Sequence, residues 1–225
     1  NEANTFEGGV RIKEGTLEVN GDGALGKADT QVILDGATLA ITKNTELQRQ
    51  IILTEKGGTV AVTEGEATLK GKLTLDSGAY SADFTKAGAG VLNLTQNNTN
   101  GSFKGNTTIK EGTLGITNQD NLAEGKLFLE GGNLRTNESL TFNKEIIINT
   151  KGGIDTANND VTVSSKIQGN GAFVKVGEGS LTLSADNSYA GGTQITGGAL
   201  VVNNDKNLGL QATDITLNGG TDRKS

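Results

Sequence analysis

The chain of 225 residues contains no cysteine, proline, histidine, methionine or tryptophan. Without cysteine it forms neither disulfides nor thiolate metal sites, so its stability must come from packing and hydrogen bonds. Without histidine and cysteine, it holds neither a Ser-His-Asp nor a Cys-His nucleophilic centre. The lack of proline suits a chain built almost entirely of ladder-bonded strands, because proline removes a ladder donor.

Strong positive charge and long apolar runs are also missing. The formal net charge is −6, which argues against nucleic acid or an anionic membrane surface as the main partner. No stretch approaches the ~18 apolar residues of a membrane span, so no membrane insertion of this segment is expected. The phosphate-binding, dinucleotide-binding and Gly-x-Ser-x-Gly motifs are absent, and no cofactor is predicted.

Glycine is abundant, with 34 residues, and a glycine-containing segment recurs three times, starting near residues 6, 103 and 189. The copies read FEGGVRIKEGTLEV, FKGNTTIKEGTLGI and YAGGTQITGGALVV. Each has an aromatic residue, a glycine two positions later, then an isoleucine, a second glycine and a leucine. In order, these residues are Phe6, Phe103 and Tyr189; Gly8, Gly105 and Gly191; Ile12, Ile109 and Ile195; Gly15, Gly112 and Gly198; and Leu17, Leu114 and Leu200.

The segments between these copies are short strands of alternating apolar and polar residues, each followed by Gly, Asn or Asp. This pattern predicts an all-β fold, a right-handed single-stranded parallel β-helix of about ten coils at ~20–25 residues per coil. We expect one β-helix segment over 1–225, cut from a longer protein because both ends fall inside a repeat. The leucines and isoleucines of the repeats should point inward. The glycines at 8, 105 and 191 should form equivalent corners, with the preceding aromatic residue stacked on or plugging each corner.

The third copy, preceded by VKVGEGSLTLSADN, resembles the autotransporter-associated β-strand repeat on Asn187, Tyr189, Gly191, Gly192, Thr193, Ile195, Gly198 and Leu200. The first two copies carry Phe in place of Tyr. In the second copy, Asn106 stands where the third copy has Gly192. The resemblance implies the passenger of a Gram-negative type V autotransporter, secreted or displayed at the bacterial surface. The translocator barrel of such proteins is not expected within this chain.

Two length differences between the repeats predict loops that project from the solenoid, at TLDSGAYSAD (74–83) and QNNTN (96–100). Binding residues are disproportionately found on loops, so these insertions are the candidate partner-binding site. Two insertions about one coil apart would form one protrusion. The candidate residues are Asp76, Tyr80, Asp83, Gln96, Asn97, Asn98 and Asn100.

Carboxylates and amides offer weaker alternatives. Asp76 and Asp83 flank Tyr80, and Asp155 and Asp160 bracket two asparagines at 158–159, so an acid–base pair is conceivable at either place. Calcium could bind at the second cluster or at the turn 20–23. The favoured interpretation is that these are ordinary turn residues of a solenoid, with no catalytic, cofactor or metal site.

The leading functional hypothesis is a non-enzymatic adhesin or virulence segment that binds a host cell-surface protein or glycan, or host matrix. Three alternatives stay open: a released effector that binds and activates a host receptor, a polysaccharide-cleaving enzyme that uses surface carboxylates, and an inert stalk. Open coil ends expose strand edges, so end-to-end self-association is also expected to be possible.

Overall fold

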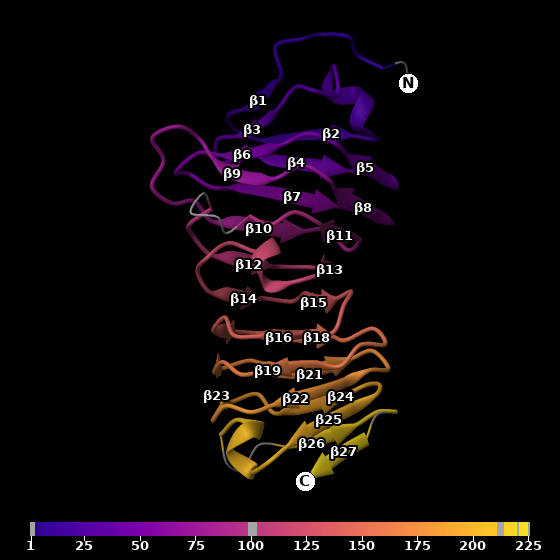
Figure 1. Cartoon of the computed structure of the whole chain (residues 1–225), viewed down its shortest axis with the longest axis vertical. Coiled ribbons are helices and arrows are strands. Elements are labelled where there is room, and N and C mark those ends of the chain that lie inside the picture. Colours follow the sequence, from indigo (N-terminus) through magenta and orange to yellow (C-terminus); the bar gives the residue numbers. More distant parts are fainter. Residues whose placement is uncertain (1–2, 99–102, 211–213, 220, 225) are drawn as a thin grey trace. The chain divides into compact units, whose positions relative to one another are not determined.

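The computed structural model describes residues 3–98, 103–210, 214–219 and 221–224. The chain divides into two compact units, one formed by residues 1–114 and 120–125 and the other by 115–119 and 126–225. Each unit is a stack of β-coils, and the two together hold about ten coils (Figure 1). The predicted all-β parallel solenoid is therefore confirmed.

In the first unit, each strand pairs in parallel with the equivalent strand of the next coil. The first stack holds β1 (Val10–Ile12), β3 (Val32–Leu34), β6 (Ile51–Leu53) and β9 (Leu73–Leu75). The second stack holds β2 (Thr16–Val19), β4 (Thr38–Ile41), β7 (Gly58–Val62), β10 (Phe84–Ala87) and β12 (Thr107–Ile109). The third stack holds β5 (Thr45–Leu47), β8 (Glu66–Leu69) and β11 (Val91–Leu94). Strand β13 (Thr113–Ile116) lies across the division between the units.

The second unit also consists of three stacks of parallel strands, which are numbered here separately from those of the first unit. Its first stack holds β14 (Leu127–Leu129), β17 (Ile146–Ile148), β20 (Ile167–Gly169) and β23 (Ser188–Tyr189). Its second stack holds β15 (Asn133–Thr136), β18 (Lys151–Asp155), β21 (Ala172–Val176), β24 (Thr193–Ile195) and β26 (Ile215–Leu217). Its third stack holds β16 (Leu140–Phe142), β19 (Val161–Val163), β22 (Ser180–Leu183), β25 (Ala199–Val202) and β27 (Thr221–Lys224).

In the part of the chain that the structure describes, helical structure is limited to short 3-10 turns at η1 (Asp22–Leu25), η2 (Gln119–Asn121) and η3 (Asp205–Leu208). Among the described residues, no helix has the length and apolar character needed to cross a bilayer.

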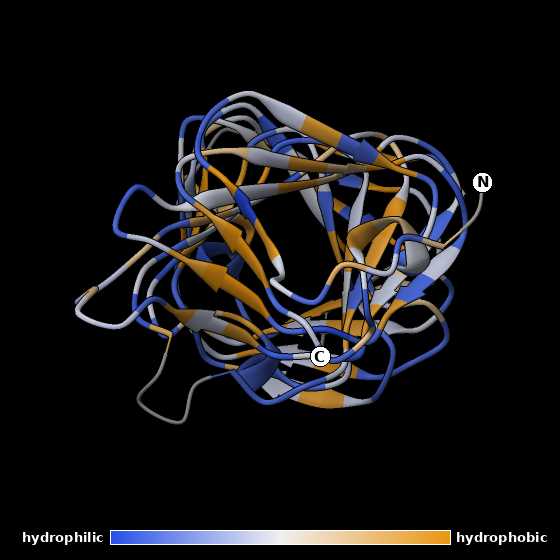
Figure 2. Cartoon of the chain, turned by 90° about the horizontal axis from the view of Figure 1, so that it is seen from above, coloured by the Kyte–Doolittle hydropathy of each residue, from blue (hydrophilic) through white to orange (hydrophobic). Residues whose placement is uncertain are grey.

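Period-2 alternation explains the interior. Successive side chains of a strand point to opposite faces, so stacked strands build inward columns of apolar residues. Figure 2 shows hydrophobic and hydrophilic residues interspersed along the strands. Leu39, Val60 and Ile109 belong to one such column and are fully buried. Each fully buried aliphatic side chain contributes roughly 1.5–3 kcal/mol to folding.

The outward side of the same strands carries a column of threonines. Thr16, Thr38, Thr59, Thr85 and Thr108 face one another in register on five successive strands of the first unit. All five side chains are exposed or half-buried. Cross-strand threonine pairs can exchange hydrogen bonds, so this column is polar without being charged.

The repeat residues follow the predicted pattern with two differences. Leu114, Leu200 and Ile195 are fully buried, as predicted, whereas Leu17 is half-buried. Phe103 and Tyr189 are fully buried, in accordance with a plugging role, and the Tyr189 ring packs on Phe173 with its centroid 5.7 Å away. Phe6 was predicted to do the same, but its side chain is 43% exposed.

The predicted equivalence of Gly8, Gly105 and Gly191 is wrong in detail. Only Gly105 has a positive φ, of 131°, whereas in the other two copies the left-handed residue is the next glycine, Gly9 or Gly192. Gly191 is required for a different reason, because a Cβ there would lie 2.4 Å from the backbone nitrogen of Ala172. Copy two has Asn106 where the others have that second glycine, so its corner is made one residue earlier.

Candidate functional site

The insertion between β9 and β10 is a loop stacked on the turns of the two preceding coils. Asp76 follows β9, and its backbone N–H donates to the carbonyl of Leu53, which holds the start of the loop against the coil below. At the far end, the N–H of Ala82 donates to the carbonyl of Lys104. The residues between these anchors, from Ser77 to Ser81, form the projecting part of the insertion (Figure 1).

A cavity of about 390 Å³ opens where this loop meets the turns that follow β3 and β6. Charged side chains from four coils line it. Arg11 lies 3.6 Å from Asp35 and 3.5 Å from Asp76, measured between guanidinium nitrogens and carboxylate oxygens. Lys56 lies 3.2 Å from Asp35. The backbone N–H of Ser77 donates to Asp76 at 2.9 Å.

Asp35 is the carboxylate of this cavity with the most hydrogen-bond and ion-pair partners. Its carboxylate accepts a hydrogen bond of 2.9 Å from the Thr54 hydroxyl and is only 14% exposed. The hydrogen bonds from Thr54 and Lys56 lower the pKa of Asp35 below its ordinary value, with Arg11 acting in the same direction. Asp35 is therefore a carboxylate throughout the physiological pH range.

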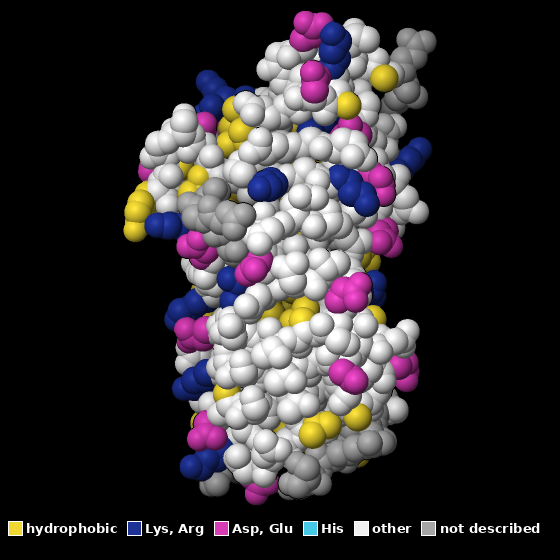
Figure 3. Space-filling model, in the orientation of Figure 1, with side chains coloured by type: hydrophobic (Ala, Val, Ile, Leu, Met, Phe, Trp, Pro, Cys, Tyr) yellow, Lys and Arg dark blue, Asp and Glu magenta, His cyan; other side chains and the backbone are white. Residues whose placement is uncertain are grey.

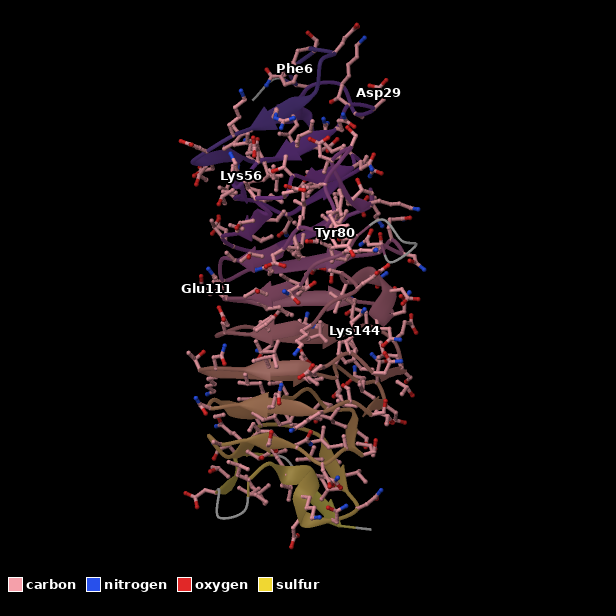
Figure 4. All side chains as sticks on the ribbon, turned by 90° about the vertical axis from the view of Figure 1, so that its left-hand side faces the viewer. Phe6, Asp29, Lys56, Tyr80, Glu111 and Lys144 are labelled. Carbon is pink, nitrogen blue, oxygen red and sulfur yellow. The ribbon has the colours of Figure 1, made fainter. Side chains whose placement is uncertain are left out.

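Tyr80 stands at the outer part of the loop. It is 76% exposed, more than the other large apolar side chains described as exposed. The Lys104 ammonium lies 4.9 Å from its ring centroid, a distance typical of a cation–π contact. Figure 4 shows Tyr80 and Lys56 on this side of the chain.

The remaining predicted site residues differ in their exposure and in their contacts. Asp83 is exposed, but its carboxylate accepts a hydrogen bond from the backbone N–H of Asn106, 2.7 Å away, and so helps to fix the neighbouring coil. Gln96 is half-buried and Asn97 is exposed at the start of the second insertion. Asn100 lies outside the described residues.

Asn98 does not lie on a loop surface, contrary to the prediction. It is 3% exposed, and its amide bridges two coils. The side-chain oxygen accepts from the N–H of Leu73 at 3.0 Å, and the side-chain nitrogen donates to the carbonyl of Asn121 at 2.6 Å. Asn98 is thus a structural residue of the interior.

Two other carboxylates singled out by the sequence are held by arginines. Asp155 is 7% exposed and accepts from Arg135 at 2.8 Å. Asp22, in the turn considered for calcium, accepts from Arg49 through both carboxylate oxygens. Within the described residues, no group of three or more acidic side chains is placed to hold a metal ion.

Arg49 was not recognised from the sequence. Its side chain is fully buried and also donates to the backbone carbonyls of residues 22, 25, 26 and 27. Arg49 therefore supplies hydrogen-bond donors, from the interior of the coil, to the backbone carbonyls of η1 and of the two residues that follow it.

Comparison with known proteins decides the nature of the repeat. The family model described as the passenger-associated-transport-repeat matches residues 1–19, 84–116 and 173–202. These segments are passenger-associated-transport repeats. The chain is 31% identical over 149 residues to the adhesin BmaC autotransporter of Brucella suis biovar 1 (strain 1330), covering 64% of this chain and 4% of that protein. It is 25% identical over 267 residues to the uncharacterized lipoprotein YdeK of Escherichia coli (strain K12), covering 96% of this chain and 20% of that protein.

The chain spans only a small share of the length of both relatives. No solved structure matches it significantly. The repeat match and the similarity to an autotransporter adhesin both support an autotransporter passenger segment, and such passengers are exported to the cell surface or secreted.

The passenger repeats explain the buried asparagine, because it occurs twice in the same role. In the third repeat the Asn187 oxygen accepts from the N–H of Ile167 at 2.8 Å, and its nitrogen donates to the carbonyl of Asn207 at 2.5 Å. This reproduces the bridge made by Asn98 in the second repeat.

The same two passenger repeats each bury a lysine that sequence reasoning missed. Lys86 and Lys175 are fully buried and stand in register with aliphatic residues of the inward columns, Lys175 between Ile154 and Ile195. Lys86 donates to the carbonyls of Ala87, Gly88 and Glu111 at 2.7–3.2 Å. Lys175 donates to those of Val176, Gly177 and Gly197 at 2.7–3.2 Å. Each ammonium thereby satisfies the carbonyls of a glycine corner.

We expect the folded chain to become more stable as the pH rises from 8 to 10. Burial lowers the pKa of Lys86 and of Lys175 to about 8, against 10.5 for a free lysine, although Glu111 raises the first and Asp155 and Glu178 raise the second. In this window the unfolded chain keeps protons that the folded chain has released, so the free energy of unfolding rises with pH. The gain is on the order of 1.4 kcal/mol per pH unit for each lysine.

Urea unfolding at pH 7.5, 8.5 and 9.5 measures this effect, and a Lys86→Met/Lys175→Met variant should lose the rise. Above pH 10 the trend should reverse, because burial raises the pKa of Tyr189 to about 12 and the unfolded phenol then loses its proton first. A wild-type profile that is flat or falls between pH 8 and 10 would contradict the assignment.

Proposed function

We propose that this passenger segment binds a host cell-surface protein or glycan through the insertion loop after β9, and that it does so without enzymatic activity. Tyr80 and the cavity beside the loop make the contact. The segment acts at the bacterial surface, or after release from it.

The exposure of Tyr80 is the observation that carries this proposal. An aromatic side chain 76% exposed to water on a projecting loop gains nothing for folding, and aromatic residues are enriched at the centres of binding interfaces. The contact with Lys104 covers part of the ring and limits its motion, which lowers the entropy lost on binding. The relative from Brucella suis is named an adhesin, which fits a binding role.

The enzyme alternative is less well supported by the same region. The acidic residues of the loop, Asp76 and Asp83, are engaged with Arg11 and with the backbone of Asn106. A glycan-cleaving site of the usual kind needs a pair of carboxyl groups that act directly on the glycosidic bond, whereas Asp83 is used to fix the neighbouring coil.

Replacing Tyr80 by alanine should reduce binding of the purified chain to host cells about tenfold or more, the loss expected of an interface hot spot. Binding is measured by flow cytometry with labelled protein over a concentration series. The melting temperature should not change, because the side chain is exposed.

Leu217→Ala is the matched control, because Leu217 is also an exposed apolar residue, at 53%, on a different part of the chain. Equal losses for the two variants would mean non-specific adhesion. Undiminished binding by Tyr80→Ala would place the binding site elsewhere. If wild-type protein binds and also triggers a host-cell response that Tyr80→Ala loses, the segment is a released effector rather than a simple adhesin.

A further inference from the structure

The cavity beside the insertion loop has hydrogen-bonding groups that its own contacts do not use fully. Arg11 is 43% exposed and reaches its two carboxylate neighbours only at 3.5 and 3.6 Å. Charge-assisted hydrogen bonds of full strength are about 2.7–2.9 Å long, so both contacts are weak. A guanidinium has five N–H donors in a rigid fork, and here most of that capacity remains for a ligand.

Acceptors stand next to this donor. Asp76 has a side chain 30% exposed, and one of its oxygens is bound only through the long contact to Arg11. The loop residues from Ser77 to Ala79 line the rest of the cavity. An exposed donor fork beside an exposed carboxylate is the arrangement that pairs of neighbouring hydroxyls require, since each hydroxyl both donates and accepts.

The charge balance excludes simple ions. The cavity is lined by two cationic side chains, Arg11 and Lys56, and three anionic ones, Asp35, Glu55 and Asp76. A phosphate or carboxylate group would meet the acidic groups, and a divalent cation would meet the guanidinium and the ammonium. A neutral ligand rich in hydroxyl groups avoids both penalties.

Size and position complete the argument. A volume of about 390 Å³ lies at the lower end of the ~300–1,000 Å³ of small-molecule sites. The lining includes no large apolar side chain of the kind that anchors protein interfaces. Tyr80 follows directly after Ala79, the last lining residue, so an extended chain of sugars leaving the cavity would pass along the aromatic residue.

We infer that the cavity formed by Arg11, Asp35, Lys56, Asp76 and the backbone of 77–79 binds a neutral sugar residue of a glycan, an inference that rests on the proposed host-binding function. Arg11 donates to one hydroxyl and Asp76 accepts from its neighbour. Asp35, held by Thr54 and Lys56, lies beside the guanidinium and balances its charge.

Saturation-transfer NMR with the purified 225-residue chain tests this inference. The probes are glucose, galactose, mannose and N-acetylglucosamine, each at millimolar concentration, with glucuronate, inorganic phosphate and calcium as comparisons. At least one neutral sugar should bind saturably. Preference for glucuronate, phosphate or calcium over every neutral sugar would overturn the inference, and so would the absence of any saturable signal.

Arg11→Gln and Asp76→Asn should each weaken the neutral-sugar binding tenfold or more, whereas Glu64→Gln, an exposed carboxylate in the turn between β7 and β8, should leave it unchanged. Thermal melting should be similar for all three, because exposed ion pairs contribute little to stability. Undiminished sugar binding by both cavity variants would overturn the inference. The sugar site and the proposed host-binding function can fail separately. If cell binding is lost in Tyr80→Ala but kept in both cavity variants, the host-binding function stands and the sugar site is wrong.

Discussion

Replacing Ile195 by aspartate should unfold the coils around it and destabilise the chain by on the order of 4–5 kcal/mol. Ile195 is fully buried and lies in register with Lys175 on one side. A carboxylate at this position would be taken out of water, and the neighbouring ammonium is already bonded to three carbonyls. The cost of burying the new charge therefore exceeds what one ion pair returns.

Thermal and urea unfolding of Ile195→Asp, followed by circular dichroism, measure this loss. Gln194→Asp is the matched control, because Gln194 is the preceding residue of the same strand and points to the opposite, half-exposed face. Only the first variant should melt early. An Ile195→Asp protein that melts like the wild type would mean that Ile195 does not belong to the core.

Asn187→Ala should cost about 2–4 kcal/mol, the second largest effect we expect. The alanine leaves the N–H of Ile167 and the carbonyl of Asn207 without their partner in the interior, where no other described side chain replaces it. Buried groups that lose a hydrogen-bond partner are penalised more heavily than the bond itself is worth.

Asn98→Ala removes the equivalent bridge in the first unit and should produce a loss of similar size. Asn170→Ala serves as the control, since Asn170 is exposed. Hydrogen exchange at the amide of Ile167 gives a local readout, and it should accelerate in Asn187→Ala. If both bridge variants were as stable as Asn170→Ala, the buried amides would have no structural role.

Sequence patterns were sufficient for the fold because the same alternation recurs in every coil. Period 2 fixes which side chains point inward, and glycine-rich corners fix where a strand ends. The period-2 alternation, applied to every residue of these strands, also predicts that the two buried lysines point inward. Lys86 and Lys175 each come two residues after a buried phenylalanine, Phe84 or Phe173, and so share its inward face.

The site could be predicted only in part. Repeat lengths located the loop and Tyr80, because an inserted segment must leave the coil. They could not identify the cavity, since Arg11, Asp35 and Lys56 belong to three other coils and meet only through the stacking register. Asn98 was misplaced because an asparagine in a polar run usually lies in a turn, and its burial depends on a carbonyl of η2 in the next coil.

The threonine column described above has a consequence for how such a chain can vary. In a parallel stack, identical positions of successive coils lie only ~5 Å apart. If the recurring residue were lysine or glutamate, each coil would add a further like charge next to the last, and the repulsion would grow with every repeat. Neutral hydroxyls avoid this accumulation, and charged side chains on the face shown in Figure 3 are scattered among neutral ones. Duplication of coils can therefore lengthen the solenoid without accumulating like charges in this column. Most of the charged residues, which differ from coil to coil, lie in the turns between strands.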